Sequence, residues 1–505
     1  MKYNVLQYLE ESCMRFPEKI AFEDENEAIT YSKTIEYAKR IASYVLRLKN
    51  YKPNAAVAIL IDRNIDSIVS FFGVVYAGCF YVPIDLNMPK ERVDLILESV
   101  KPIAIIDSRI KSGDYDNSKS YIDLLKNYTV CDDLLQKVRN NMIDEDPLYA
   151  IFTSGSTGVP KGVLISHRSV IDLLDAFNEA FHFENDSVFC NQAPFDFDVS
   201  VKDIYNSIYC GGKVVVAPKK LFMSPKLLVE FLVKKEINTM IWAVSALKII
   251  SDFAALDAVD ELPKLRYSMF SGEVMPPKSL MYWKKHFPNT KFVNLYGPTE
   301  ITCNCTYYIV DRDLSPEEKI PAGKPFTNTR IKLIDESGKL ITEAGQLGEI
   351  CVSGRCLALG YWSDFEKTEK SFPKDPFVNG YSSRMYKTGD LGQYDDDGNI
   401  VFSSRKDHQI KHMGHRIELG EIEAALNSIP FVTTAVCIYI EAKETILCFY
   451  QADEECKKEI IRELGLKLPK YMWPNVFVKK EVLPLNKNGK IDRIKLKKEW
   501  ETENG

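Results

Sequence analysis

Residues 149–167 read YAIFTSGSTGVPKGVLISH and decide the fold, because an apolar run passes directly into a loop of small residues and then a lysine. The apolar run predicts a β-strand. Small residues allow backbone N–H groups to approach a phosphate, hydroxyls add donors, and Lys161 supplies positive charge. A flexible turn is the alternative interpretation. The candidate phosphate-binding residues ahead of the lysine are Thr153, Ser154, Gly155, Ser156, Thr157 and Gly158.

This loop differs from the Walker A loop of P-loop NTPases. The Walker pattern ends in Gly-Lys-Ser/Thr, whereas here Pro160 precedes Lys161 and Gly162 follows it. Pro160 also lacks the backbone N–H that a phosphate cradle would use. The sequence therefore points away from a P-loop ATPase or kinase and toward a different nucleotide loop.

The chain around this stretch alternates short β-rich runs with helical segments. Helices are expected at residues 66–78 and 91–99. Such a β-then-α rhythm predicts a mostly parallel sheet covered by helices, hence an α/β fold. The expected strands are residues 55–61, 101–108, 213–219, 238–244 and 291–297.

The secondary structure expected from the sequence changes twice toward the C-terminus. From about residue 331 it becomes β-rich, with a hairpin at 330–341 and strands at 348–354 and 398–404. The last hundred residues read as a small α+β piece, with helices at 416–429 and 456–468 and strands at 432–440 and 444–451. We predict a large N-terminal core at 1–404 that includes the β-rich subdomain, a hinge at 405–411, and a small mobile C-terminal domain at 412–505.

Composition narrows the functional classes. The 505 residues carry 65 Lys and Arg against 71 Asp and Glu, and a net charge of −6 argues against nucleic acid as a partner. The 12 cysteines are scattered without a C-x-x-C pair, which predicts reduced thiols and a cytoplasmic protein. The N-terminus reads as an amphipathic helix and not as a signal peptide, and no apolar run of about 18 residues predicts a membrane span.

The run T-S-G-S-T-G-x-P-K-G resembles the signature loop of the adenylate-forming superfamily, which includes acyl-CoA synthetases, luciferases and peptide-synthetase adenylation domains. Further motifs in family order extend the resemblance over nearly the whole chain, which implies use of ATP and Mg²⁺. In NLYGPTE (294–300), it implies that Tyr296 stacks on adenine, Thr299 contacts phosphate and Glu300 reaches Mg²⁺. Other ATP-binding positions implied by the resemblance are Gly272, Glu273 and Asn294.

Three later motifs of the same family follow. In YKTGDLG (386–392), Asp390 would accept hydrogen bonds from both ribose hydroxyls, a task that suits an acceptor-only carboxylate. In residues 404–423, Arg405 would contact ribose and Asp407 would be the hinge, although this chain has Ser404 where many members have Gly. In PLNKNGKIDR (484–493), Lys490 would be the catalytic lysine that bridges the substrate carboxylate and the α-phosphate.

The segment NQAPFDFDVSVKDIY (191–205) bears on the substrate. In amino-acid-activating members, the Asp of an F-D-x-S motif pairs with the α-ammonium of the substrate, and Asp198 occupies that position. Acyl- and aryl-CoA ligases generally lack this Asp. The structural alternative is that Asp198 caps a helix.

Other pocket positions, by resemblance to peptide synthetases, point in two directions. Trp242 would shrink the pocket and favour a small side chain, whereas Lys202 would suit an acidic or polar one. Residues 191–203 and 269–277 resemble D-alanine–carrier protein ligases, but Ser271 replaces their usual Cys, which leaves the preference for D-alanine open. The remaining expected pocket positions are Val199, Met269, Leu295, Cys303 and Asn304.

These observations predict activation of an amino acid and its transfer to the phosphopantetheine thiol of a separate carrier protein. No carrier domain follows Arg493 in this sequence, so we expect the carrier to act in trans. The alternatives are a natural-product enzyme for another amino acid, an acyl- or aryl-CoA ligase, and a noncatalytic nucleotide-binding protein. Lys161, Glu300, Asp390 and Lys490 argue against the last of these.

Overall fold

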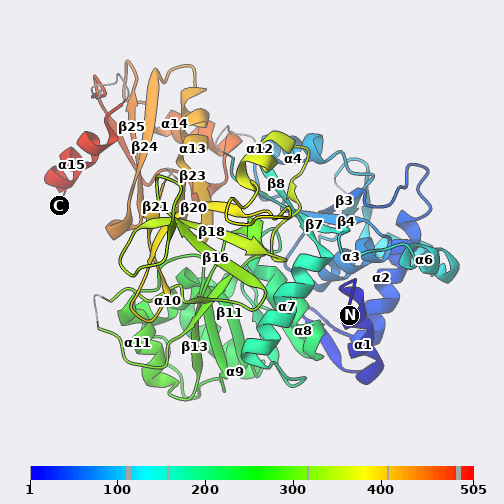
Figure 1. Ribbon diagram of the computed structural model, residues 1–505. Helices are drawn as coiled ribbons and strands as arrows, with labels where there is room; N and C mark the ends of the chain where they lie inside the picture. The colour runs from blue at the N-terminus through cyan, green and yellow to red at the C-terminus, as the bar shows by residue number, and fades with distance from the viewer. Residues whose placement is uncertain are drawn as a thin grey trace. The chain divides into compact units, whose positions relative to one another are not determined.

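The computed structural model describes residues 2–109, 115–155, 160–315, 318–406, 409–484 and 491–504. The chain forms two compact units (Figure 1). Unit 1 comprises Met1–Asp85, Val100–Ile151 and Gly162–Lys406, and unit 2 comprises Leu86–Ser99, Phe152–Lys161 and Asp407–Gly505. The division into a core, a hinge at 405–411 and a C-terminal domain stays a prediction.

A seven-stranded sheet has the order β19-β8-β7-β4-β3-β5-β6. Its central strands pair in parallel, as the alternation of strands and helices predicted. The strands are β3 (Ala56–Leu60), β4 (Phe80–Ile84), β5 (Ala104–Asp107), β6 (Ser118–Ser120), β7 (Pro147–Thr153), β8 (Lys161–Ser166) and β19 (Gly360–Tyr361). Neighbouring helices are α2 (Tyr31–Val45), α3 (Ile65–Tyr76), α5 (Tyr121–Asn127), α6 (Asp132–Arg139) and α12 (Phe365–Ser371).

A nine-stranded sheet has the order β15-β14-β13-β12-β11-β9-β10-β1-β2, parallel from β13 to β1. Its strands are β1 (Ile20–Glu23), β2 (Ala28–Thr30), β9 (Val188–Asn191), β10 (Lys213–Val216), β11 (Thr239–Ala243), β12 (Tyr267–Ser271), β13 (Lys291–Tyr296), β14 (Thr306–Ile309) and β15 (Lys324–Pro325). The associated helices are α7 (His167–Phe181), α8 (Val199–Cys210), η1 (Lys219–Met223), α9 (Pro225–Lys234), α10 (Val244–Asp252) and α11 (Pro277–His286).

Two apolar clusters cover the faces of the nine-stranded sheet. One contains side chains of α3, α7 and α8 together with both large sheets, and the Tyr81 and Tyr205 hydroxyls meet in it at 3.1 Å. The other packs α9, α10 and α11 against the opposite face, around Trp242 and Trp283. Since strand side chains alternate between faces, the strands β9 to β13 each contribute to both clusters.

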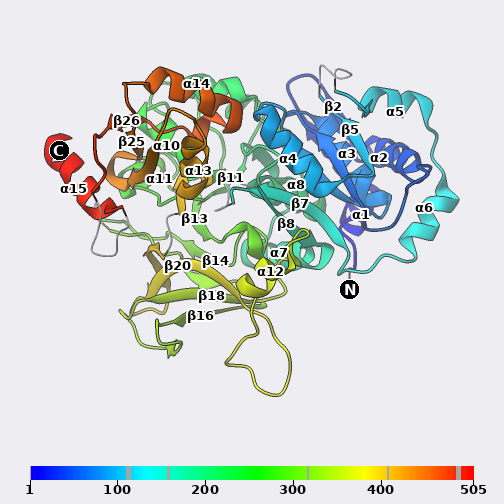
Figure 2. The same cartoon turned by 90° about the horizontal axis from the view of Figure 1, so that it is seen from above.

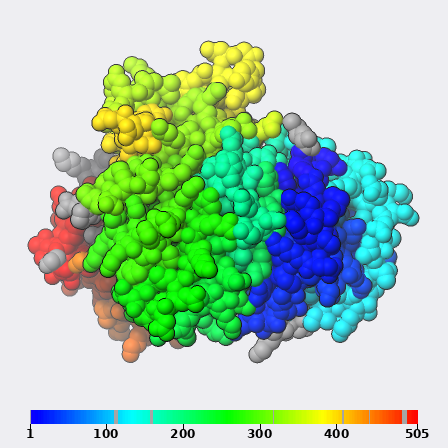
Figure 3. Space-filling view, turned by 90° about the horizontal axis from the view of Figure 1, so that it is seen from below, coloured from blue at the N-terminus to red at the C-terminus, as the bar shows by residue number. Residues whose placement is uncertain are grey.

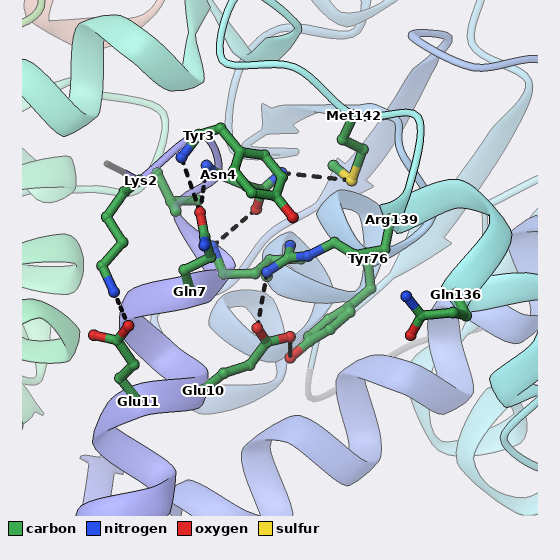
Figure 4. Close-up of polar contacts among 12 residues, drawn as sticks. Lys2, Tyr3, Asn4, Gln7, Glu10, Glu11, Tyr76, Gln136, Arg139 and Met142 are labelled. Carbon is green, nitrogen blue, oxygen red and sulfur yellow. Dashed lines mark hydrogen bonds and ion pairs between the residues drawn. The ribbon is translucent and has the colours of Figure 1, made fainter.

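The N-terminal helix α1 (Leu6–Arg15) docks on unit 1 through buried and half-buried polar contacts. Glu10 accepts hydrogen bonds from Tyr76 at 3.0 Å and from Arg139 at 2.8 Å (Figure 4). On its other side, the Ser12 hydroxyl donates to the Ile208 carbonyl at 2.6 Å. Figure 3 shows the N-terminal residues, in blue, continuous with the neighbouring green surface. The predicted amphipathic helix is therefore part of the folded unit.

The β-rich subdomain is a five-stranded sheet with the order β17-β16-β18-β20-β21 (Figure 2). As predicted, β16 and β17 form a hairpin, in which Leu333 pairs with Ile341 and Gly338 adopts a φ of +84° at the turn. The strands are β16 (Thr329–Ile334), β17 (Leu340–Ile341), β18 (Gly348–Gly354), β20 (Tyr386–Tyr394) and β21 (Ile400–Arg405).

Unit 2 contains α4 (Lys90–Val100), which was predicted, and an α+β piece with its own apolar core. The helix predicted at 416–429 begins later, because residues 415–418 pair with residues 409–412 in a hairpin. Its elements are β22 (Gln409–His412), β23 (His415–Glu418), α13 (Leu419–Asn427), β24 (Thr434–Ile440), η3 (Glu441–Lys443), β25 (Thr445–Gln451), α14 (Lys457–Lys467), η4 (Lys470–Met472), β26 (Val476–Lys479) and α15 (Arg493–Asn504).

No helix in the described ranges is long and apolar enough to cross a bilayer.

Candidate active site

The phosphate-loop candidate begins at the end of β7. The Thr153 hydroxyl is buried and has no hydrogen-bond partner among the residues that the structure describes. Gly155 N–H donates to the Glu421 carboxylate at 3.2 Å, and the binding of phosphate by this loop stays a prediction. Lys161 opens β8. The predicted loop residues Ser156, Thr157 and Gly158 lie outside the described residues.

Glu421 is held in unit 2 by an ion pair that sequence analysis missed. Arg92 of α4 donates to the Glu421 carboxylate, and their side chains are 5% and 1% exposed. Burial raises the pKa of the Glu421 carboxyl, while the Arg92 charge opposes this rise. The Ser154 hydroxyl adds a bond to the Arg416 carbonyl at 2.7 Å. These contacts connect α4, the phosphate loop and the β23–α13 segment.

We expect Arg92→Met to lower the free energy of unfolding of unit 2 by about 3–5 kcal/mol, because it leaves the buried Glu421 carboxylate without its cation. Lys90→Met is the matched control, since Lys90 forms an exposed ion pair with Asp94 on the same helix and should cost under about 1 kcal/mol. Urea unfolding of the full chain measures both. Equal midpoints for the two variants would contradict this role of Arg92.

The predicted adenine and ribose residues come together in unit 1. Tyr296, at the end of β13, donates its hydroxyl to Asp390 Oδ2 at 2.6 Å, and Arg405 donates to Asp390 Oδ1. Asp390 lies in β20 and pairs across the sheet with Arg405 in β21. Burial and the nearby Asp390 carboxylate raise the pKa of Tyr296, so the phenol remains protonated. This arrangement fixes a carboxylate beside an aromatic ring, as a nucleoside site requires.

The predicted magnesium residue Glu300 lies in η2 (Thr299–Ile301), directly after β13. Glu300 is fully buried, and its Oε1 accepts a hydrogen bond from the Tyr361 hydroxyl at 2.8 Å. Mg²⁺ prefers oxygen ligands and is often bound by one or two carboxylates together with substrate phosphates, so the donor chemistry of Glu300 fits this ion. Sequence analysis assigned no role to Tyr361, whose hydroxyl orients the carboxylate.

Three further nucleotide candidates lie on or directly after the neighbouring strands β12 and β13. Gly272 follows β12 with a φ of +96°, and a Cβ there would meet no atom within 4 Å. Glu273 accepts from the Ser245 N–H at 3.1 Å, and Asn294 donates to the Pro321 carbonyl at 2.8 Å. Asn294 lies within β13 and not at its end. The structure thus uses Glu273 and Asn294 to hold backbone segments, and their contact with nucleotide stays a prediction.

The predicted amine-binding residue Asp198 lies at the N-terminus of α8. Its side chain makes no capping hydrogen bond with the helix, which removes the support for the structural alternative. The Cys303 thiol donates to the Asp198 carbonyl at 3.0 Å and holds this backbone beside the segment after β13. Val199 follows as the first residue of α8.

Lys202 lies one helical turn after Asp198 and is fully buried. Its ammonium donates to Asn304 Oδ1 at 2.9 Å and to Ser271 Oγ at 3.2 Å. The segment that carries Asn304 packs closely against Gly297, where a Cβ would lie 2.6 Å from the Asn304 Cα. A glycine is therefore required at 297, and it brings Asn304 to the lysine.

Met269, Leu295 and Cys303 belong to the apolar cluster that also contains side chains of α8. Trp242 does not: it packs in the cluster on the opposite face, and its indole N–H donates to the Cys190 carbonyl at 2.8 Å. The prediction that Trp242 narrows the substrate pocket is therefore wrong. The error is one residue of strand register, since successive side chains alternate between faces.

Ala243 is the residue that the register identifies in its place. Along the β11–β12 pair, Ile241 lies opposite Met269, Trp242 opposite Phe270, and Ala243 opposite Ser271. Period-2 alternation along residues 239–243 could have indicated this side chain. The side chain beside Ser271 is therefore a methyl group and not an indole.

The predicted hinge residue Asp407 and the predicted catalytic Lys490 lie outside the described residues. Their roles remain predictions. The described parts of their motifs are ordered: Arg405 binds Asp390, and Arg493 at the start of α15 donates to Glu423.

The model of the family described as "AMP-binding enzyme" matches residues 9–362. A D-alanine–D-alanyl carrier protein ligase of Bacillus licheniformis is 34% identical, over 96% of this chain and 97% of the relative. Bacitracin synthase 1 of the same species is 33% identical over 96% of this chain, which spans only 9% of that synthase.

A solved structure of an NRPS protein containing adenylation and PCP domains has a TM-score of 0.85 at 24% identity, over 98% of this chain and 84% of that one. At this identity the likeness shows the fold alone. The match to the family model over most of the chain, and the relative aligned along its whole length, show the family. This chain belongs to the family of AMP-binding enzymes.

Proposed function

We propose that this chain uses ATP to activate an amino acid as its aminoacyl-adenylate and then passes the aminoacyl group to the phosphopantetheine thiol of a separate carrier protein. The observation that carries the proposal is the segment between β13 and β14. In it, Tyr296 donates to Asp390 and Glu300 accepts from Tyr361, while Cys303 and Asn304 bond to Asp198 and Lys202. One short stretch of chain therefore joins a nucleotide site to an amino-acid site.

In the first step, a carboxylate oxygen of the amino acid attacks the α-phosphorus of ATP, and the bond from that phosphorus to the bridging oxygen breaks to release pyrophosphate. Asp390 would accept from the ribose hydroxyls, the loop from Thr153 to Lys161 would hold the phosphates, and Lys490 would bridge the two anionic reactants. Glu300 would hold Mg²⁺, which neutralises phosphate charge. Asp198 would bind the α-ammonium and orient the carboxylate.

In the second step, the thiol sulfur attacks the carbonyl carbon and AMP leaves. A domain rotation about Asp407 would exchange the residues that face the adenylate, a hinge motion that can complete a second site. The bacillary ligase supports a carrier protein as the acceptor because it matches this chain from end to end. Dependence on ATP supports the predicted cytoplasmic location.

An acyl- or aryl-CoA ligase is the competing function. Asp198 argues against it, because acyl- and aryl-CoA ligases generally lack an aspartate at this position of the motif. Within the amino-acid class, D-alanine is one candidate, and a natural-product amino acid is another.

Amino-acid-dependent exchange of pyrophosphate into ATP tests the first step. The panel contains both enantiomers of alanine, aspartate and glutamate, together with glycine, serine, cysteine and several aryl acids. We expect exchange with at least one amino acid. Loading of a phosphopantetheinylated carrier protein, compared with free CoA, then tests the acceptor. Exchange only with acids that lack an amine would overturn the proposal in favour of the CoA ligase.

A further inference from the structure

Lys202 carries a buried ammonium whose partners are both neutral. The side chain is fully buried, and its two hydrogen bonds to described residues go to the Ser271 hydroxyl and the Asn304 amide oxygen. Within the described ranges, no ion pair to Lys202 occurs. An ammonium has three donors, so one of its hydrogens has no partner in the part of the chain that the structure describes.

A buried charge without a counter-ion is costly. Burial lowers the pKa of Lys202, while the carboxylates of Asp198 and Asp203 act in the opposite direction. Asp203 has partners of its own, because it accepts from Asn191 at 3.1 Å and lies near the Arg63 guanidinium. Among the described residues Lys202 forms no hydrogen bond with Asp203, so the ammonium retains a donor that can bind an anion.

The geometry of α8 relates this lysine to the amine site. Asp198 and Lys202 are separated by four residues, which places their side chains on one face of the helix, one turn apart. Ser271 at the end of β12 and Asn304 after β13 hold the ammonium from the opposite side. The face therefore presents a carboxylate and an ammonium side by side, with the methyl group of Ala243 opposite Ser271.

We propose that Lys202 determines specificity by binding the side-chain carboxylate of an acidic amino acid whose α-ammonium is bound by Asp198. This inference rests on the proposed adenylation function and names the substrate class of the same site. The α-ammonium of the substrate then pairs with Asp198, and its side-chain carboxylate pairs with Lys202. The α-carboxylate remains available to react with ATP. A small apolar amino acid would leave the lysine charge unpaired, and an amide side chain would offer it only a neutral oxygen.

Pyrophosphate exchange with both enantiomers of aspartate and glutamate, compared with asparagine, glutamine, alanine and glycine, tests this proposal. We expect at least one acidic amino acid to exceed its amide by about 100-fold or more in kcat/KM, because sites that pair a polar substrate group reject analogues that leave the partner unpaired. Lys202→Met should lower kcat/KM for the acid by about 100-fold and reduce the preference over the amide to under about 10-fold. Ser271→Ala should cost under about 10-fold, because the ammonium keeps Asn304.

Lys213→Met is the matched control, since Lys213 forms its ion pair with Glu23 on the far strands of the same sheet and should keep the acidic preference. Lys202→Gln provides a second, polar variant if Lys202→Met does not fold, and circular dichroism reports folding for both. Exchange with alanine or glycine but not with acidic amino acids would overturn this proposal and leave the adenylation function standing. No exchange with any amine-bearing acid would overturn both.

Discussion

Lys490→Ala is expected to reduce adenylate formation by about 100- to 1,000-fold, a loss typical of removing one donor that stabilises charge in a transition state. The ammonium would bridge the substrate carboxylate and the α-phosphate only while the new bond forms, so kcat should fall more than the affinity for ATP. Pyrophosphate exchange measures the rate, and equilibrium titration with ATP measures the affinity.

The control for this prediction is Lys487→Ala, because Lys487 lies three residues earlier in the same motif. It should keep exchange within about two-fold of the wild type, because the family resemblance assigns the bridging role to Lys490 and no role to Lys487. Transfer from a preformed aminoacyl-adenylate to the thiol should also survive in Lys490→Ala, since that step does not use the carboxylate–phosphate bridge. Equal losses in the two lysine variants would contradict a catalytic role for Lys490.

Asp198→Asn should lower kcat/KM for the amino acid by roughly 100- to 5,000-fold, because removing one partner of a buried ion pair costs about 3–5 kcal/mol. The same variant should gain relative activity with the corresponding acid that lacks the amine, whose binding requires no carboxylate. Because the Asp198 side chain makes no capping bond to α8, the substitution should leave the fold intact.

Asp186→Asn is the control for the amine site. Asp186 is an exposed carboxylate that pairs with Arg266 ahead of β9, so its removal should change exchange by under about two-fold. A retained preference for the amine-bearing substrate in Asp198→Asn would show that another group binds the α-ammonium. That result would also remove the pairing of Asp198 with the α-ammonium, on which the proposed role of Lys202 depends.

Much of the fold could be predicted from the sequence because the signals were local. The strand expected at 55–61 is β3 at Ala56–Leu60, and the helix expected at 66–78 is α3 at Ile65–Tyr76. Apolar periodicity and an asparagine that caps α3 define such elements without reference to the rest of the chain. The predicted start of the helix at residue 416 was wrong, because residues 415–418 form an antiparallel hairpin with residues 409–412 and are not helical.

The sequence by itself determined the chemistry of contiguous motifs: a phosphate loop, a T-G-D carboxylate and an F-D-x-S aspartate, whose residue types and spacing are readable along the chain. Only the tertiary structure decided which side chains meet across large separations. Arg92 and Glu421 are 329 residues apart, Glu300 and Tyr361 are 61 apart, and Lys202 and Asn304 are 102 apart. It also decided that Trp242 faces away from Met269, because a one-residue difference in register reverses the face of a strand side chain.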